Sequence, residues 1–303
     1  MPSRVLVSGA SGPIGAALLP SLQASGYTVS RLVRRRSSRA DEILWDPAQS
    51  LAPGSVSGFD AVIHLAGESV VGRWTPDRKA GILNSRVFGT RHLCEALAQS
   101  LPPPRVLISA SAIGYYGDRG EEILRENSPP GQGFLPEVCR QWEAATQAAS
   151  EAGMRVVSIR IGLVLSPSGG ALQAMLWPFR LGLGGKIGSG RQWWSWIDIS
   201  DLVGAVHHIL KDDSLQGAVN MVSPEPARNL AFTKLLAGVL SRPAIFPMPA
   251  FVARLALGEM AEEVLLASQR VEPTKLVTGG YGFQQPDLKL AFERILTSPK
   301  PAR

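Results

Sequence analysis

A strand that runs directly into a glycine turn is the feature that most limits how this chain can fold. Residues 5–8 form an apolar strand pattern, and an apolar helix pattern begins at Ala16. Glycines spaced three apart between them allow a tight turn, close approach of a ligand, and close packing of helix on strand. Free amides at the helix N-terminus then suit the pyrophosphate of a dinucleotide; a glycine-rich turn without a ligand is the alternative. We expect six turn residues to form part of the cofactor-binding site: Gly9, Ser11, Gly12, Pro13, Ile14 and Gly15.

The residues after the second predicted strand indicate which dinucleotide fits. An acidic side chain about twenty residues after the glycines accepts from a free ribose 2′-hydroxyl and would repel a 2′-phosphate. Here the strand at 28–33 is followed by Arg34 and Arg35, and no carboxylate comes before Asp41. Because guanidinium groups bind phosphate well, the pattern favours NADP(H) over NAD(H), with both arginines as cofactor ligands. The alternative is a basic loop that faces water.

The order of the predicted elements places this turn in a larger α/β fold. Strand patterns alternate with helix patterns up to Leu165, which predicts a Rossmann-type, doubly wound parallel sheet with helices on both faces. A segment rich in glycine and aromatic residues follows, and then a helix, a strand and a mostly helical remainder. We expect an NADP-binding domain over 1–165 plus about 198–222. A smaller, mostly helical substrate-binding lobe should comprise 166–197 plus 223–303.

Composition excludes several other classes of protein. The 303-residue chain is 45% hydrophobic and 18% charged, as is usual for a globular protein, and its net charge is +6. That mild charge comes without a nucleic-acid-binding motif, and no apolar run reaches the length of a membrane span. Cys94 and Cys139 lack metal-ligand spacing and favour a reducing, cytoplasmic location. We expect no metal, a small-molecule substrate, and a monomer or homodimer.

Several longer motifs make the chain resemble the extended short-chain dehydrogenase/reductase superfamily, also called the NAD-dependent epimerase/dehydratase family. More narrowly, it is similar to an epimerase-like subgroup that carries an appended C-terminal domain of unknown function. The resemblance implies the Rossmann fold and a nicotinamide cofactor. The matching segments are 9–15, 60–68, 73–74, 85–86, 89–90, 111–117, 142–143, 178–185, 188–192, 196–202, 258–271, 279–281 and 286–288.

The catalytic pair that this resemblance implies is missing. The superfamily uses a Ser or Thr after the fifth strand, and a Tyr four residues before a Lys on the next helix. Ser111 fits the first position, but alignment on the following Glu143 puts Leu135 and Cys139 at the other two. Leucine has no proton to move, and a neutral cysteine offers no cation to lower a neighbour's pKa.

Other residues could replace the pair or hold the cofactor. Tyr115 and Tyr116 lie just beyond Ser111 and could act as acid or base, or could be packed aromatics. Glu68 could do the same, or could form an ion pair with Arg73 or Arg86. Arg86 stands where the wider family often has Asn, and it could contact the nicotinamide half of the cofactor, bind a substrate anion or bridge two helices. The ends of the fourth and fifth strands should also contact the cofactor, through Leu65, Ala66, Gly67 and Ser109.

The segment between Trp177 and Trp196 is predicted to form much of the substrate pocket, because ligands bind beyond the carboxyl ends of parallel strands. Arg180, Arg191 and Trp194 suggest an anionic or partly planar substrate such as a sugar nucleotide. Alternatively, the tryptophans simply pack between the lobes.

Two functions fit these observations. The first is an NADP(H)-dependent oxidoreductase or epimerase with an atypical acid/base residue. The second is a catalytically weak or inactive NADP(H)-binding sensor or scaffold, which the missing Tyr-Lys pair favours.

Overall fold

A seven-stranded parallel sheet forms the centre of the molecule in the computed structural model, which describes residues 3–35, 39–52 and 54–297. The strand order is β11-β7-β5-β4-β1-β2-β3, so the order reverses beside β1, as in a doubly wound fold. The predicted Rossmann-type fold is therefore confirmed. The seven strands are β1 Arg4–Ser8, β2 Thr28–Val33, β3 Glu42–Leu44, β4 Ala61–His64, β5 Val106–Ala112, β7 Arg155–Ile161 and β11 Gly217–Met221.

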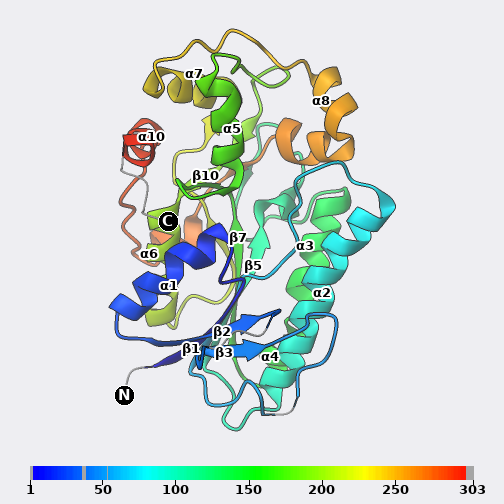
Figure 1. Ribbon diagram of the computed structural model, residues 1–303, viewed down its shortest axis with the longest axis vertical. Coiled ribbons are helices and arrows are strands. Elements are labelled where there is room, and N and C mark those ends of the chain that lie inside the picture. The colour runs from blue at the N-terminus through cyan, green and yellow to red at the C-terminus, as the bar shows by residue number, and fades with distance from the viewer. Residues whose placement is uncertain (1–2, 36–38, 53, 298–303) are drawn as a thin grey trace.

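Helices cover both faces of this sheet (Figure 1). On one face, α1 and α6 enclose a core of strand side chains that includes Val5 and Ile108. On the other face, α2 and α4 pack over Leu6 and Leu107, and α3 lies against α2. The helices of this part are α1 Pro13–Ala24, α2 Pro76–Ala98, α3 Phe134–Ala144, α4 Gln147–Glu151 and α6 Ile199–Lys211.

A second group of helices lies beyond the carboxyl ends of the strands and has its own core (Figure 1). Trp196, Phe232 and Phe292 are buried there, with the two phenylalanine rings edge to face at 4.9 Å. Its helices are α5 Gly170–Arg180, α7 Asn229–Val239, α8 Ala250–Leu257 and α10 Leu288–Thr297. Short pieces connect it to the sheet: β6 Ile123–Leu124, β8 Leu163–Leu165, β9 Trp193–Trp194, β10 Trp196–Asp198, β12 Ala227–Arg228, β13 Arg270–Val271, α9 Thr274–Thr278 and the π-helix Ala261–Leu266.

The C-terminal segment returns to the sheet domain and is pinned there by a buried carboxylate. Both oxygens of Asp201 accept backbone amides, from Gln284 at 2.7 Å and from Gln285 at 2.8 Å. The Tyr281 hydroxyl donates to the carbonyl of Asp201 at 2.9 Å, and Leu276 is part of the sheet core. Residues assigned to the second lobe by sequence therefore also pack against the first.

Two predicted strands differ from the observed ones in ways that matter for the site. The fourth strand ends at His64, because residues 65–67 turn away over the glycine turn. The fifth strand continues past Ser109 to Ala112, so Ser111 lies within it.

Within the described residues, no helix is both long enough and apolar enough to cross a membrane.

Candidate functional site

The glycine turn has the geometry that its spacing predicts. Gly9 has a φ of +71°, and a methyl carbon on it would lie 2.6 Å from the carbonyl carbon of Leu65. A methyl carbon on Gly15 would lie 2.5 Å from the Gly9 carbonyl oxygen. Gly12 is the N-cap of α1 and supplies no capping side chain, so the first amides of this helix are available to a phosphate.

The turn after β4 lies against the glycine turn and is held by Ser8. Ser8 Oγ accepts the amides of Leu65 at 3.2 Å and Ala66 at 3.3 Å. Gly67 follows, and a methyl carbon there would lie 3.3 Å from the guanidinium carbon of Arg86. The structure thus brings Leu65, Ala66 and Gly67 together with the turn at Gly9.

A fully buried histidine supports both turns through hydrogen bonds. His64 Nδ1 lies 2.6 Å from Ser8 Oγ, and its Nε2 lies 2.9 Å from Thr90 Oγ1, which also accepts Trp142 Nε1 at 2.9 Å. Ser8 Oγ already accepts two amides, so its own hydrogen is directed to Nδ1 and Nε2 carries the ring proton. Burial lowers the pKa of His64 to about 4, which keeps the ring neutral. The histidine is therefore structural.

This depressed pKa makes the stability of the protein depend on pH. Between its ordinary pKa of 6.5 and about 4, His64 binds a proton in the unfolded chain but not in the folded one. The free energy of unfolding should therefore fall as the pH falls through this window, by about 3 kcal/mol in all. Urea unfolding at a series of pH values measures this dependence. The free energy of unfolding of the wild type should fall by this amount between pH 6.5 and about 4, and that of His64→Gln should not. Parallel curves for the two proteins would contradict the assignment.

The arginines predicted to bind a 2′-phosphate lie directly after β2, at the same edge of the sheet as the glycine turn. Arg34 and Arg35 are both exposed there. The nearby Asp41 receives two hydrogen bonds from Arg31, at 2.6 and 3.0 Å, and Glu42 lies 3.3 Å from the same guanidinium group. The Asp41 carboxylate is thus bonded to Arg31. The position after β2, where an acidic residue would bind the ribose of NAD(H), holds Arg34 instead.

Ser109 and Ser111 point to the face of the sheet that α3 covers, but their surroundings differ. Ser109 is buried, and its Oγ has no hydrogen-bond partner among the described residues. Such an atom fits a role toward an absent ligand. Ser111 Oγ donates to Glu143 Oε1 at 2.7 Å and also interacts with the thiol of Cys139.

A buried ion pair engages the tyrosines that follow Ser111. Arg160 donates to both oxygens of Glu143, at 2.8 and 2.9 Å, and to the hydroxyl of Tyr116 at 3.0 Å. Tyr116 is fully buried and donates to Asn220 Oδ1 at 2.7 Å. Burial raises the pKa of Tyr116 to about 12. The ring of Tyr115 carries the Arg160 guanidinium over its face, 3.5 Å from the ring centre.

Glu68 is bound by a different arginine from the two named by sequence. Its carboxylate is paired with Arg78, which also donates to the carbonyl of Ser69 at 2.6 Å. Arg73 instead donates to the Leu255 carbonyl at 3.2 Å. Arg78 lies within the first turn of α2, which begins beside Glu68, whereas Arg73 faces α8. The ion pair therefore joins the two ends of the 68–78 loop.

A cavity of about 270 Å³ lies between the carboxyl ends of the strands and the second group of helices. Leu135 and Cys139, at the positions of the usual Tyr and Lys, form part of its wall. Burial raises the pKa of the Cys139 thiol to about 12, so the thiol stays protonated. Arg86 lies over the ring of Trp142 at 5.0 Å and lines the same wall. The four predicted catalytic residues, Ser111, Tyr115, Tyr116 and Glu68, are not among its lining residues.

Glu263 is the functional candidate that sequence reasoning missed. It lines the cavity from the π-helix, and its two oxygens accept the amides of Phe134 at 2.8 Å and Leu135 at 2.7 Å. The carboxylate thereby caps α3, whose own N-cap residue Gly133 has no side chain. A helix without a capping side chain was the available signal, but nothing local could indicate a partner 129 residues away.

The residues predicted to bind substrate are not placed together. Arg180, at the end of α5, and Arg191 are both exposed and do not line the cavity. Trp194 does line it, packs edge to face on Phe232 at 5.2 Å, and donates to the Leu265 carbonyl at 3.3 Å. Trp194 therefore forms cavity wall and lobe core at once. Among the described residues, no three His, Cys, Asp or Glu side chains gather where they could hold a metal ion.

Comparison with known families and sequences finds similarity along the whole chain. Residues 5–221 match the model of the NAD dependent epimerase/dehydratase family, and residues 248–295 match a domain of unknown function, DUF1731. The human epimerase family protein SDR39U1 is 36% identical over 297 residues, covering 97% of this chain and 99% of its own length. Epimerase family protein MT2273 of Mycobacterium tuberculosis is 38% identical over 297 residues, with 97% and 98% covered.

Solved structures agree with these matches. A crystal structure of the human epimerase family protein SDR39U1 (isoform 2) with NADPH superimposes with a TM-score of 0.89 at 35% identity, covering 96% of this chain and 98% of that one. UDP-N-acetylglucosamine 4-epimerase from Bacillus cereus gives a TM-score of 0.75 at 14% identity, with 97% and 98% covered. This second likeness shows only a shared fold.

Proposed function

Because the chain belongs to the NAD dependent epimerase/dehydratase family, as its sequence motifs predicted, we propose that it is an NADP(H)-dependent oxidoreductase or epimerase. The observation that carries the proposal is the phosphate cradle at Gly9–Gly15, followed by arginine rather than a carboxylate after β2. A relative that is 35% identical was crystallised with NADPH, which supports the choice of cofactor.

Each part of the cradle has a task in this proposal. The amides at the start of α1 bind the pyrophosphate, and Gly12 leaves room for it. Arg34 and Arg35 bind the 2′-phosphate. The 65–67 turn and Ser109 border the path toward the cavity and would hold the nicotinamide half of the cofactor, which would supply hydride chemistry there. Because the cavity lies between two lobes, a bound substrate is shielded there from bulk water.

The proton that accompanies hydride transfer needs an acid or base near the cavity. Ser111 and Tyr115 remain candidates by position, as do Tyr116 and Glu68, although each is engaged by Glu143, Arg160 or Arg78. Among the described lining residues, Glu263 carries the one carboxylate. We therefore add Glu263 to these candidates as the carboxylate in the cavity wall.

Exchange of Arg34 for alanine tests the cofactor. In Arg34→Ala, NADPH should bind about 10- to 100-fold more weakly, because a charge-assisted hydrogen bond to the 2′-phosphate is lost. NADH, which lacks this phosphate, should bind with nearly unchanged affinity. Both affinities can be measured by cofactor fluorescence, with the exposed Arg242→Ala as a charge-matched control in the second lobe. Equal losses for both cofactors would overturn the 2′-phosphate assignment.

The alternative is an NADP(H)-binding sensor or scaffold with little or no catalysis. Leu135 and Cys139 in the cavity wall favour it, because neither can move a proton at neutral pH. The two functions differ in the fate of the cofactor's hydride. Deuterium at the reactive carbon of NADPH should reach a bound carbonyl compound if the protein is an enzyme, and should stay on the cofactor if it is a sensor.

The remaining expectations stand as part of this proposal. We propose a small-molecule substrate, no nucleic-acid partner, a cytoplasmic location, and a monomer or homodimer. The location is supported by Cys94 and Cys139, which are both buried, free thiols.

A further inference from the structure

We propose that the cavity binds a compact, largely apolar molecule bearing a single anionic group, such as a carboxylate, and that Arg86 receives this group. The inference rests on the proposed function, because it names the substrate class of the same site. It departs from the sugar nucleotide suggested by the sequence.

The walls of the cavity are mostly hydrocarbon. They come from the sheet domain, from α5 and from the segment after α8, so both lobes present apolar side chains to the same space. A volume of about 270 Å³ is at or below the low end of ordinary small-molecule sites, which span roughly 300–1,000 Å³. The apolar lining residues are Val70, Ala112, Ile113, Leu135, Val138, Trp142, Ile161, Leu163, Ala171, Met175, Trp193, Trp194, Val264, Leu265 and Ala267.

Arg86 supplies the one positive charge among the described lining residues. Its guanidinium group stacks on Trp142 and donates a hydrogen bond to the Ile82 carbonyl at 3.2 Å. Within the described part of the chain it has no carboxylate at ion-pair distance: Glu68 acts on it only through space and is itself paired with Arg78. Burial lowers the pKa of Arg86. A partly buried cation with no carboxylate in contact with it is costly, and an anionic ligand would relieve that cost.

The two charged residues of the wall lie at different places along α3. Glu263 caps the helix at Phe134 and Leu135, whereas Arg86 lies beside Cys139 and Trp142, at least one helical turn further on. An anion at Arg86 is thus kept away from Glu263 by the apolar stretch of α3 between them. This arrangement fits a molecule with one charged end.

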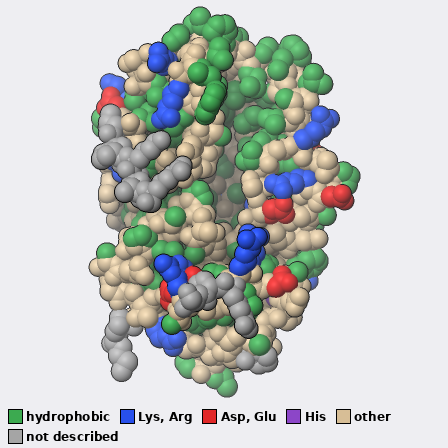
Figure 2. Space-filling view, viewed as in Figure 1, with side chains coloured by type: hydrophobic (Ala, Val, Ile, Leu, Met, Phe, Trp, Pro, Cys, Tyr) green, Lys and Arg blue, Asp and Glu red, His purple; other side chains and the backbone are tan. Residues whose placement is uncertain are grey.

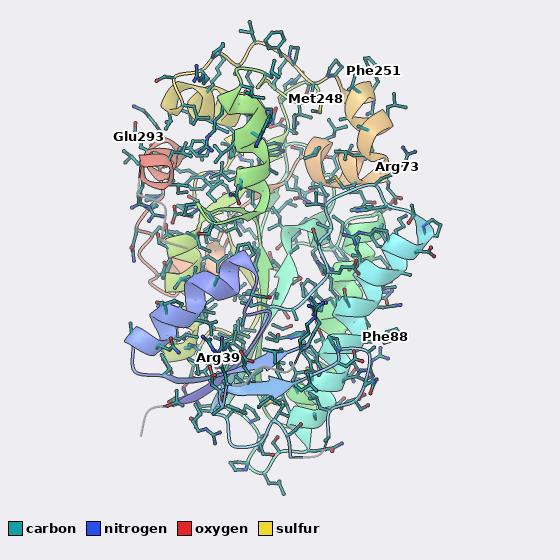
Figure 3. The ribbon with its side chains drawn as sticks, viewed as in Figure 1. Arg39, Arg73, Phe88, Met248, Phe251 and Glu293 are labelled. Atoms are coloured by element: carbon teal, nitrogen blue, oxygen red, sulfur yellow. The ribbon has the colours of Figure 1, made fainter. Side chains whose placement is uncertain are left out.

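The opening above the cavity is also apolar. Figure 2 shows hydrophobic side chains on both sides of a hollow in the upper half of the molecule, and Figure 3 shows Met248 and Phe251 near the top of the molecule, by α8. Trp177 on α5 and Phe251 on α8 are 72% and 68% exposed. By contrast, a sugar nucleotide carries two phosphates, and the predicted Arg180 and Arg191 lie outside the cavity wall. One lining arginine cannot neutralise a diphosphate.

Calorimetric titration of the full chain, with and without saturating NADP⁺, tests the inference with three probes. These are 2-naphthoate, the neutral 2-naphthamide and UDP-glucose. In the wild type, naphthoate should bind about tenfold or more tightly than naphthamide, because it gains a charge-assisted contact with Arg86. Arg86→Gln should remove this preference while NADPH still binds, and Arg86→Lys should retain part of it.

A second pair of variants tests the location without touching Arg86. Met175→Trp fills the cavity from α5 and should weaken naphthoate binding at least tenfold, with NADPH affinity unchanged. Ala174→Trp, an exposed neighbour outside the wall, should change neither.

Three results would overturn the inference. In the first, UDP-glucose binds more tightly than naphthoate, and in the second, the acid and the amide bind with equal affinity. In the third, Arg86→Gln weakens the binding of NADPH and of naphthoate by the same factor, which would make Arg86 a cofactor ligand. Failure of the wild type to bind NADPH would instead overturn the proposed function. The naphthoate comparison on the cofactor-free protein would then still decide the substrate class.

Discussion

Gly15→Ala is expected to abolish measurable NADPH binding and to lower the free energy of unfolding by about 3 kcal/mol. The added methyl carbon would lie 2.5 Å from the Gly9 carbonyl oxygen and 2.7 Å from the Cα of Ala10, and both are backbone atoms that cannot rotate away. Helix α1 must therefore move off β1. Its first amides would then lose their position relative to the pyrophosphate, so binding and stability should fall together.

Gly238→Ala is the matched control for this change. Gly238 is also helical, near the end of α7, and nothing lies within 4 Å of the position of its new methyl carbon. It should raise the free energy of unfolding by about 0.5–1 kcal/mol, because alanine restricts the unfolded chain and favours helix. Thermal unfolding and NADPH fluorescence measure both variants. Normal cofactor affinity in Gly15→Ala would show that the turn does not bind NADPH in the way proposed.

Arg160→Met is expected to cost about 3–5 kcal/mol of unfolding free energy, the usual range for removing one partner of a buried ion pair. Only 4% of the Arg160 side chain is exposed, and it donates to both oxygens of Glu143, to Tyr116 and to the Glu126 carbonyl. Methionine fills a similar volume but supplies no donors. The carboxylate would remain buried without a counter-ion beside Ser111.

The exposed pair on the same helix provides the comparison. Arg140 and Glu137 are 2.5 Å apart, but their side chains are 55% and 47% exposed, so water screens the pair. Urea unfolding of Arg140→Met should therefore differ little from that of the wild type. If Arg160→Met is equally mild, then the Glu143–Arg160 pair does not hold α3 to β7, and Ser111 and Tyr116 would be freer to act in catalysis than the structure indicates.

Local patterns predicted the sheet well, because each strand and each turn is specified by neighbouring residues. The glycine spacing at 9–15 placed the strand, turn and helix within a few residues of their observed limits. The error at Ser111 has a physical cause. Small residues at 109–112 resemble a strand end, yet β5 pairs with β7 as far as Ala112 and so carries Ser111 under α3.

The candidate site was harder to predict, because its contacts join distant segments. The missing Tyr-Lys pair could be read from α3 alone, and both substituted positions do line the cavity. The hydrogen bond from Arg160 to Tyr116 could not be predicted from sequence, because it depends on how β7 pairs with β5. Glu68 illustrates the same limit: an ion pair was foreseen, but its partner Arg78 is set by where α2 begins.

The cap that Glu263 places on α3 also sets an order of events during synthesis. Phe134 and its helix leave the ribosome 129 residues before the carboxylate that binds their amides. Since domains fold as units from the N-terminus, the glycine turn and its strands can assemble while the cavity still lacks the wall formed by residues 263–269. The nascent chain thus acquires the glycine turn first, and its cavity is walled in only when the last third of the chain arrives.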